Sequence, residues 1–419
     1  MPALASLVLL MTLLLVAAAA SSFAPIHVAP VKTWSVAPMM AHTHQHFRAF
    51  CRMLSPETAQ LFTEMITCDE VIKAADVEKE RDSSSYQLDR LLAYSSQYEN
   101  ADSLILQLGG RDPARLARAC AIAAGHPRHP YQRFNLNSGC PSNTIASVNQ
   151  YGCALMLEPE LTAECCREMG REGEVSVKCR IGLDTREEYE HLHDFISTVS
   201  SQGGVRYFQI HARKALMGST PMSNRQVPPL RYDLVHAVAR DFPALRIELN
   251  GGLTSTGACM DQLSAEPALS GVMVGRAVVN HPYAFSGMDL LLGRINGQPS
   301  LRAQATRGAL LAEYSSYLSS LPPPSSKLAP SSVTQMLSPV FNLFAGEPGC
   351  ERFQRKMSTM VKRGVSSPAF ILALASKEIP TEILTGTTSS RDDAQDLVRD
   401  LPWVDKRKKT TALMKANIL

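Results

Sequence analysis

Cys140 is the residue of this chain best suited to chemistry. It lies in Asn135–Ser142, where an apolar run gives way to a loop punctuated by glycine and proline. A thiol at such a position is held by a rigid element and can still be reached by a substrate. A thiol without special neighbours stays mostly protonated at neutral pH, which suits it to donate a proton rather than to attack as a thiolate. The alternative is a small buried hydrophobic side chain, which is the fate of most free cysteines.

Two cations and an amide also stand at the ends of apolar runs, namely Lys178, His211 and Gln107. A cation that a strand holds inside a protein needs an anionic partner. A reduced flavin is such a partner, because its N1–C2=O edge carries negative charge. Gln107 could hydrogen-bond the pyrimidine edge of the same ring. The alternatives are a Lys in an ordinary ion pair and a core His whose hydrogen bonds are satisfied.

Glycines and an arginine follow the last two apolar runs. Asn250, Gly251 and Gly252 come after one run, and Gly275 and Arg276 come after the next. Glycine lets backbone N–H groups approach an anion closely, and arginine adds charge. Either pair alone is more often a simple turn. Because both occur on successive runs, we interpret them as a phosphate site, which implies a phosphorylated ligand.

The elements that would position these residues repeat in a strand-then-helix order. Eight apolar runs are predicted as strands: Ser35–Met39, Leu61–Ile66, Leu104–Leu108, Arg133–Leu136, Val175–Cys179, Tyr207–His211, Arg246–Asn250 and Gly271–Gly275. Segments with helical spacing separate most of them, such as Asp112–Ala124, Leu161–Met169 and Ser255–Leu263. This order predicts an α/β fold, a (β/α)8 TIM barrel, whose strand ends meet on one catalytic face. Asp69–Asn100 is longer than a usual connection and is interpreted as a variable surface excursion.

The composition is that of a soluble globular protein, with 419 residues, 45% of them hydrophobic, 19% charged, and a net charge of +3. The ten cysteines show no CxxC and no Cys/His ligand spacing, so we expect a reduced protein without a metal. Residues 1–33 are predicted to be a cleavable targeting segment, because the apolar run Leu7–Ala20 is short for a membrane span and ends in small residues. Ser21–Pro25 resembles the cleavage motif of bipartite presequences in algae with complex plastids. A plastid is therefore favoured over secretion, a membrane anchor, the mitochondrion or the cytoplasm, and no stable membrane association is expected after processing.

Three segments follow the targeting segment. Residues 34–290 form the predicted barrel domain, and residues 291–365 form a helical domain with nine Lys and Arg against three acids. A basic face there could meet phosphates, and a solvated helix surface is the alternative. Residues 366–419 are predicted to be a partly disordered extension. Its run Lys406–Lys409 could touch RNA, although a solvated tail is the simpler interpretation.

Together these motifs resemble those of the tRNA-dihydrouridine synthases, in family order from about Trp34 to Gly364. The segments that carry the resemblance are Ser35–Met39, Leu106–Gly110, Asn135–Ser142, Val175–Lys178, His211–Lys214, Asn250–Gly252 and Val274–Arg276. The run His211–Ala215, with Asn224-Arg225, Val227–Leu230 and Phe344–Gly349, is most similar to the bacterial-type A branch, which acts on uridine 20 and often 20a of the D-loop.

The resemblance implies a cofactor, a reductant and a substrate. FMN would lie across the barrel mouth with its phosphate on Asn250–Gly252 and Gly275-Arg276, while Pro38, Met39 and Met40 would back its ring and Gln107, Lys178 and His211 would line it. NADPH would reduce the flavin, N5 would deliver hydride to C6 of uridine, and Cys140 would protonate C5. The substrate is the D-loop of tRNA, with Asn137, Arg213, Lys214, Asn224 and Arg225 near it. A monomer is expected.

The chain also departs from the family pattern, since Met40–His44 replaces the Leu-Asp-Trp-Thr-Asp common in this branch. This loses an acid and an aromatic ring beside the predicted flavin. Two other functions stay open. One is an FMN-dependent barrel dehydrogenase of a free pyrimidine, similar to dihydroorotate dehydrogenase, which would not obviously need Cys140 in this loop or a basic domain. The other is a non-catalytic tRNA-binding protein on an inherited barrel.

Overall fold

The computed structural model describes residues 31–80, 87–94, 97–99, 103–142, 144–186, 189–218, 224, 228–298, 300, 303–321, 332–364 and 367–387. The targeting prediction, apart from residues 31–33, lies outside these residues. So do Arg225 and the Lys406–Lys409 run.

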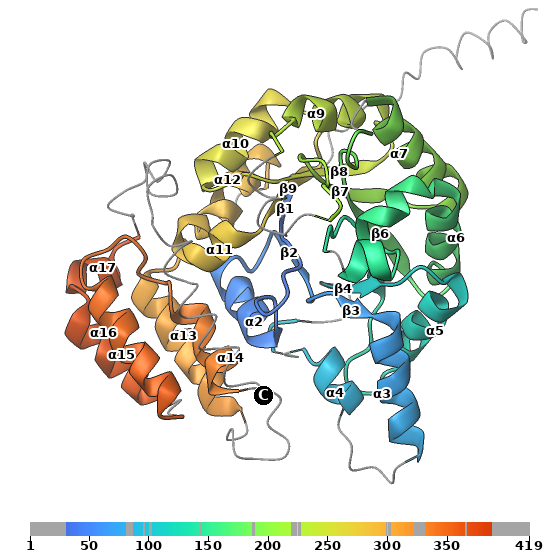
Figure 1. Ribbon diagram of the computed structural model, residues 1–419. Helices are drawn as coiled ribbons and strands as arrows, with labels where there is room; N and C mark the ends of the chain where they lie inside the picture. The colour runs from blue at the N-terminus through green and yellow to red at the C-terminus, as the bar shows by residue number, and fades with distance from the viewer. Residues whose placement is uncertain are drawn as a thin grey trace, which may run out of the picture. The chain divides into compact units, whose positions relative to one another are not determined.

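Eight parallel strands close into a barrel. They are β1 (Thr33–Val36), β2 (Ala59–Phe62), β4 (Leu104–Gly109), β5 (Arg133–Ser138), β6 (Glu174–Arg180), β7 (Tyr207–His211), β8 (Arg246–Asn250) and β9 (Gly271–Val274). Each pairs with the next, and the ring closes because β1 pairs with both β2 and β9 while β2 pairs with β4. A short ninth strand, β3 (Ile66–Thr67), pairs with β4 alone. The predicted (β/α)8 fold is confirmed, and Figure 1 shows helices around the strands.

The strands are buried on both faces, which explains their nearly continuous apolar runs. A small cluster inside the barrel consists of Ala37, Phe62, Ile105, Tyr207 and Met273. The register of the sheet matters most for function. Asn137 on β5 is paired with Lys178 on β6, and His211 on β7 is paired with Asn250 on β8. Residues far apart in the sequence therefore become neighbours at the carboxyl ends of the strands.

Helices alternate with the strands. They are α2 (Gln45–Leu54), α3 (Cys68–Glu80), α4 (Gln87–Leu92), α5 (Pro113–Ala124), α6 (Pro159–Met169), α7 (Tyr189–Gly203), α9 (Tyr232–Asp241), α10 (Thr256–Ala265), α11 (Arg276–Asn280) and α12 (Met288–Ile295). Local sequence explains where several begin. The side chain of Asp112 accepts a hydrogen bond from the Arg115 N–H at 2.9 Å, and Ser255 caps α10 in the same way.

The interpretation of Asp69–Asn100 as a surface excursion was wrong for its described part. α3 packs against α5 as the helix after the second strand, and it buries Val71 and Ile72. Glu99, near the end of the segment, is buried and pairs with Arg48 of α2 at 2.7 Å. The charge and Ser content of this segment concealed an amphipathic helix.

The C-terminal region is helical, as predicted. It contains α13 (Arg307–Ser320), α14 (Val333–Leu337), the short η4 (Ser338–Val340), α15 (Cys350–Lys362), α16 (Pro368–Glu378) and α17 (Thr381–Thr385). A buried ion pair of 2.7 Å joins Arg307 to Glu347, and the Arg307 guanidinium lies 3.8 Å from the ring centre of Tyr283, which follows the barrel. Helices α16 and α17 lie beyond the predicted boundary at Val365 and pack against α13.

Two structural features are absent from the described residues. Among them, no helix is both long and apolar enough to cross a membrane. The same part of the chain holds no group of three or more His, Cys, Asp or Glu side chains that could bind a metal ion.

Candidate functional site

The carboxyl ends of β6, β7 and β8 bring a lysine, a histidine and an asparagine together. Lys178 Nζ donates a hydrogen bond to Asn250 Oδ1 at 3.1 Å, and the Asn250 amide nitrogen donates to the Met273 carbonyl at 2.7 Å. Burial lowers the pKa of Lys178 to about 8, so the lysine is still mostly charged at neutral pH. The prediction that Lys178 and His211 lie in one site agrees with this geometry.

His211 lies in a strongly positive environment. Burial, followed by the charges of Arg180 and Lys178, lowers the pKa of His211 well below its usual range, so its imidazole is neutral at physiological pH. Its Nδ1 atom is buried without a hydrogen-bond partner among the described residues. A buried ring nitrogen without a partner, with cations nearby, is suited to form a hydrogen bond with a polar group of an anionic ligand.

Gly251 and Gly252 follow β8 and lie beside His211. Their φ angles are +112° and +73°, in the region that favours glycine. A Cβ at Gly251 would lie 3.1 Å from His211 Cε1, and one at Gly252 would lie 2.4 Å from Leu230 Cδ1. Gly275 precedes α11, where Arg276 is exposed. A side chain at Gly251 or Gly252 would crowd His211 or Leu230, so this turn after β8 favours glycine in both space and backbone conformation.

The backbone of the cysteine loop is held by the Asn137 side chain and by Cys153. Asn137 Oδ1 accepts hydrogen bonds from the N–H groups of Gly139 at 3.1 Å and Cys140 at 3.0 Å. The Cys140 carbonyl accepts one from the Cys153 N–H at 3.0 Å. Cys140 is partly exposed, whereas the other nine cysteines are all buried. This thiol therefore differs from the structural cysteines of the chain in its access to solvent.

Gln107 takes part in an amide network that crosses the barrel. Its Nε2 donates to Asn135 Oδ1 at 2.7 Å, and its Oε1 accepts from Asn137 Nδ2 at 3.1 Å. Asn135 continues the network to Gln209 at 2.8 Å. Gln107 is buried, and both the nitrogen and the oxygen of its side-chain amide form hydrogen bonds with neighbouring asparagines. Its contribution to the site includes orienting Asn137, which in turn holds the Cys140 loop.

The loop after β1 forms another side of the barrel mouth. Pro38 and Met39 are partly buried, whereas Met40 is 62% exposed. The Ala41 N–H donates to the Glu64 carboxylate, and burial raises the pKa of Glu64. Pro38 and Met39 are therefore more enclosed by the protein than Met40.

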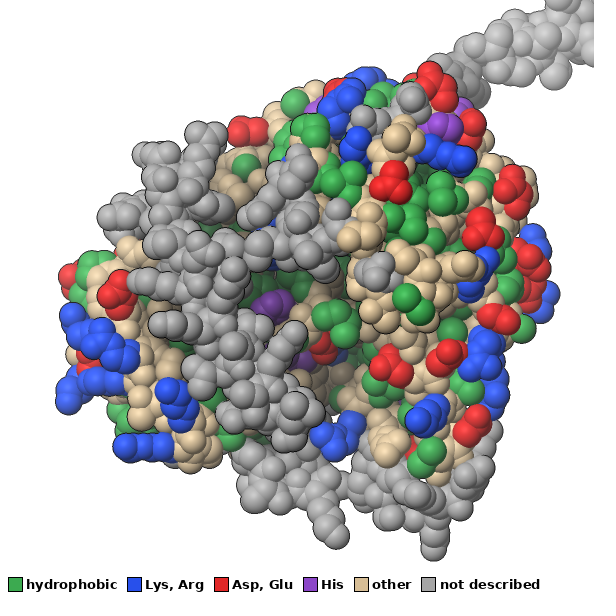
Figure 2. Space-filling model, in the orientation of Figure 1, with side chains coloured by type: hydrophobic (Ala, Val, Ile, Leu, Met, Phe, Trp, Pro, Cys, Tyr) green, Lys and Arg blue, Asp and Glu red, His purple; other side chains and the backbone are tan. Residues whose placement is uncertain are grey.

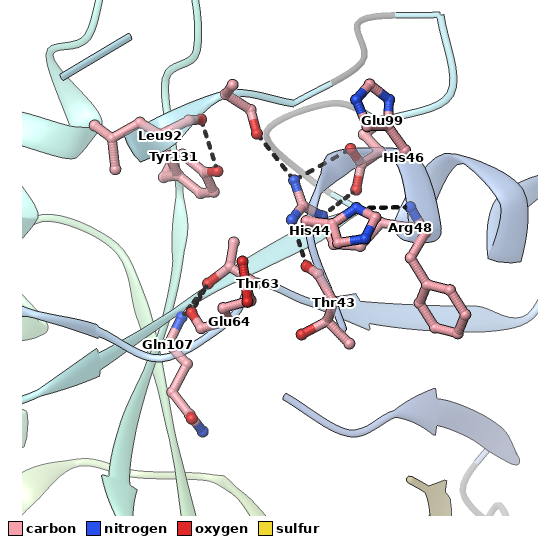
Figure 3. Close-up of polar contacts among 12 residues, drawn as sticks. Thr43, His44, His46, Arg48, Thr63, Glu64, Leu92, Glu99, Gln107 and Tyr131 are labelled. Carbon is pink, nitrogen blue, oxygen red and sulfur yellow. Dashed lines mark hydrogen bonds and ion pairs between the residues drawn. The ribbon is translucent and has the colours of Figure 1, made fainter. Parts of the chain in front are cut away.

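His44, at the end of this loop, and His46, in the first turn of α2, connect this helix to the C-terminal helices. His44 Nδ1 accepts from the Phe47 N–H at 3.4 Å, and His44 Nε2 lies 3.1 Å from Ser338 Oγ. His46 Nδ1 lies 2.7 Å from the Tyr317 hydroxyl. Figure 3 shows these histidines beside Arg48, which bonds to the Thr43 carbonyl at 2.7 Å and to Glu99. His44 therefore caps the N-terminus of α2.

The residues predicted on the tRNA side occupy different environments. Arg213 and Lys214 are partly buried in the loop after β7, where the Arg213 guanidinium bonds to the Pro228 carbonyl. Asn224 is fully buried, and its amide bonds to both the N–H and the carbonyl of Leu216, at 2.6 and 2.8 Å. Asn224 shapes this loop in the present structure rather than facing a substrate. Figure 2 shows a hollow near the middle of this view, with His, acidic and hydrophobic side chains visible in it.

Arg180 is a residue of the site that sequence reasoning missed. It ends β6, only 6% exposed, and its guanidinium bonds to backbone carbonyls of the cysteine loop and of the Arg213-Lys214 loop. The spacing from Lys178 could have revealed it, because residues two apart on a strand share a face.

Comparisons with known proteins identify the family of the chain. The family model described as "Dihydrouridine synthase (Dus)" matches residues 35–365. The tRNA-dihydrouridine(20/20a) synthase of Shewanella oneidensis is 34% identical over 356 residues, which is 84% of this chain and 96% of that protein. The protein of the same name from Synechocystis sp. is 36% identical over 83% of this chain and 95% of its own. The one from Salmonella typhimurium is 40% identical over 62% and 72%. The resemblance inferred from the motifs is confirmed.

Proposed function

The chain belongs to the dihydrouridine synthase family, and from this premise we propose that it reduces the C5–C6 double bond of a D-loop uridine in tRNA, at position 20 or 20a. The observation that carries the proposal is the match along 84% of the chain to a protein named for that reaction. Within the match, Cys140 keeps a partly exposed thiol next to the ends of β5 and β6.

FMN fits the residues at the strand ends. Gly251, Gly252 and Gly275 would hold its phosphate with Arg276, because glycine lets backbone N–H groups approach an anion closely and arginine adds positive charge. His211 offers a buried nitrogen without a partner among the described residues, and Lys178 offers a positive charge. Pro38 and Met39 would lie against the ring. When bound and reduced by NADPH, FMN supplies a hydride for C6 of the uridine.

Cys140 would hold the proton that C5 requires. Negative charge develops toward C5 and O4 as the ring is saturated, so a positioned acid lowers the barrier. Asn137 fixes the backbone N–H of Cys140, and Gln107 fixes the Asn137 amide. These two side-chain amides would thereby fix the position of the Cys140 backbone, and with it the thiol, at the carboxyl end of the barrel.

The uridine must leave the base stack of folded tRNA to reach this site. Arg213 and Lys214 lie in the loop after β7 and would meet the RNA backbone near the extruded nucleotide. The helical C-terminal region, with its basic α15, would contact the tRNA farther from the pocket.

The test is a two-step flavin assay on the purified protein. We expect a yellow protein that NADPH bleaches without oxygen, and that unmodified tRNA, but neither orotate nor free uridine, reoxidises. Mass spectrometry should then locate dihydrouridine at position 20 or 20a. Reoxidation by orotate and not by tRNA would favour a dehydrogenase of free pyrimidines. A colourless protein that binds tRNA and does not bind added FMN would favour the non-catalytic alternative.

We also propose that the protein works in a plastid, on the basis of the apolar run Leu7–Ala20 and the motif Ser21–Pro25. The full chain, tagged at its C-terminus in an alga with a complex plastid, should enter that organelle, and a variant lacking residues 2–25, which leaves β1 intact, should stay in the cytosol. Entry of both forms, or of neither, would contradict this assignment.

A further inference from the structure

Arg180 connects two loops of the site to one strand. Its Nε donates to the Gly139 carbonyl at 2.8 Å. Its Nη1 lies 3.0 Å from the Lys214 carbonyl, and 3.4 Å from the carbonyls of Arg213 and Asn224. Gly139 directly precedes Cys140, so one guanidinium binds the cysteine loop on one side and the loop after β7 on the other.

The chemistry of the guanidinium suits this role. It is planar, and its N–H groups point in fixed directions, so its contacts define a distance between the two loops. An ammonium group is a single point at the end of a flexible chain and cannot occupy both the Nε and the Nη1 positions. The charge of Arg180 is buried beside that of Lys178, and it contributes to the lowered pKa of both Lys178 and His211. Keeping a second buried cation here is costly unless its contacts serve a purpose.

The cysteine loop is also packed against the strand that carries Arg180. A Cβ at Gly139 would lie 3.3 Å from both the Lys178 carbonyl oxygen and the Cys179 carbonyl carbon. The loop therefore rests on β6 at Gly139 and is bonded to the end of β6 through Arg180. A change at Arg180 would remove the bond to the Gly139 carbonyl, next to Cys140, and the bond to the Lys214 carbonyl, while the contacts of Asn137 and Cys153 with the Cys140 backbone would remain.

We propose that Arg180 is a positioning residue that sets the separation between the Cys140 thiol and the substrate-facing Arg213-Lys214 loop. The expected effect of Arg180 on dihydrouridine formation rests on the proposed function. It assigns Arg180 no contact with the tRNA. Its effect passes through the backbone of the two loops.

The test uses Arg180→Lys and Arg180→Gln, with Arg206→Lys as a matched control, because Arg206 is exposed and lies just before β7. We expect both Arg180 variants to bind FMN and to be reduced by NADPH at the wild-type rate. The kcat for dihydrouridine formation should fall about 10–100-fold, since a displacement of about 1 Å of a reacting group can cost that much. The KM for tRNA should change by less than about threefold, and the control should match wild type.

A salt titration separates positioning from direct RNA contact. A residue that neutralises a phosphate lowers the slope of log affinity against log salt by roughly 0.7–0.9 when removed. The slope for Arg180→Gln should equal that of wild type. A lower slope would mean that Arg180 touches a phosphate, and it would overturn the proposal. Wild-type kcat in both variants would overturn it as well, and so would failure of both variants to keep FMN.

The alkylation rate of Cys140 provides a readout independent of activity. Iodoacetamide labelling, followed at the Cys140 peptide by mass spectrometry, should change at least about threefold in Arg180→Lys and stay constant in Arg206→Lys. An unchanged alkylation rate in Arg180→Lys would contradict the proposal that Arg180 holds the Cys140 loop in position. If wild-type protein forms no dihydrouridine, the proposed function fails, while the alkylation result still decides whether Arg180 holds the loop.

Discussion

The backbone of Cys140 is held from two sides, by Asn137 through its amide oxygen and by Cys153 through its N–H. Neither contact uses the sulfur atom, which leaves the thiol able to approach a substrate. The proposed role of Cys140 is therefore separable from the folding of its loop, because a smaller side chain would leave both backbone contacts in place.

From this separation we expect Cys140→Ala to keep FMN and its reduction by NADPH, and to lose dihydrouridine formation by about 10²–10⁴-fold, the usual range for a missing general acid. Single-turnover reoxidation of the reduced flavin by tRNA measures the loss. Cys259→Ala is the control, since Cys259 is also a free cysteine but is buried. A Cys140→Ala protein that forms product at the wild-type rate would remove this thiol from the acid role.

The sequence was enough to predict which residues end the strands, but not all of their partners. Cys140, Lys178, His211 and Asn250 could be predicted because each follows an apolar run, and parallel strand ends meet at one face. The bond from Lys178 to Asn250 spans β6 to β8, and the bonds of Gln107 to Asn135 and Asn137 depend on sheet register. Side-chain pairing of this kind depends on three-dimensional distances that no local pattern contains.

At the scale of elements, the strands were predicted to within a few residues because a barrel strand must be apolar on both faces. The strand β8 (Arg246–Asn250) has the predicted bounds. The helix α3 was missed because its buried positions, Val71, Ile72, Ala74 and Ala75, are small or short and stand among charged residues. The packing of α16 could not be predicted either, since it follows from contacts with α13 and α15 rather than from its own composition.

The junction between α2 and the C-terminal helices should respond to pH. Burial lowers the pKa of His44 to about 3 and that of His46 to about 4, while an unfolded histidine has a pKa of about 6.5. Between those values the unfolded chain binds more protons, so the stabilisation present above pH 6.5 is lost as the pH falls. Each pH unit below 6.5 lowers the free energy of unfolding by about 1.36 kcal/mol for each imidazole that stays neutral in the folded protein. At pH 5, about 1.5 units lower, the loss is about 2 kcal/mol for each histidine.

We therefore expect His46→Gln, which keeps a hydrogen-bonding group near Tyr317, to lose less stability than wild type between pH 8 and pH 5. The difference should be about 2 kcal/mol, measured by urea unfolding at both pH values. His191→Gln serves as control because His191 is exposed. Equal losses in wild type and His46→Gln would mean that His46 titrates normally in the folded protein.

At the scale of the whole molecule, the barrel and the C-terminal helices would have to bind one tRNA together. Figure 2 shows Lys and Arg side chains over the C-terminal helices. On α15, Arg352 and Lys356 pair with the Glu378 carboxylate at 3.1 and 2.5 Å. Arg355 and Arg363 are exposed. Among the described residues, neither of them forms an ion pair with an acidic side chain.

This difference predicts unequal contributions to tRNA affinity. A cation whose charge is already balanced releases fewer counterions on binding, so Arg355→Ala and Arg363→Ala should each lower the slope of log affinity against log salt by roughly 0.7–0.9. Arg352→Ala should lower the slope less, because Glu378 already neutralises part of the Arg352 charge in the wild-type protein. In the variant, Glu378 pairs with Lys356 alone. Fluorescence anisotropy with labelled tRNA between about 50 and 200 mM salt would measure the slopes. Equal slopes for Arg352→Ala and Arg355→Ala would show that the Glu378 pairs open when tRNA binds, and wild-type slopes in all three would show that α15 does not reach the phosphates.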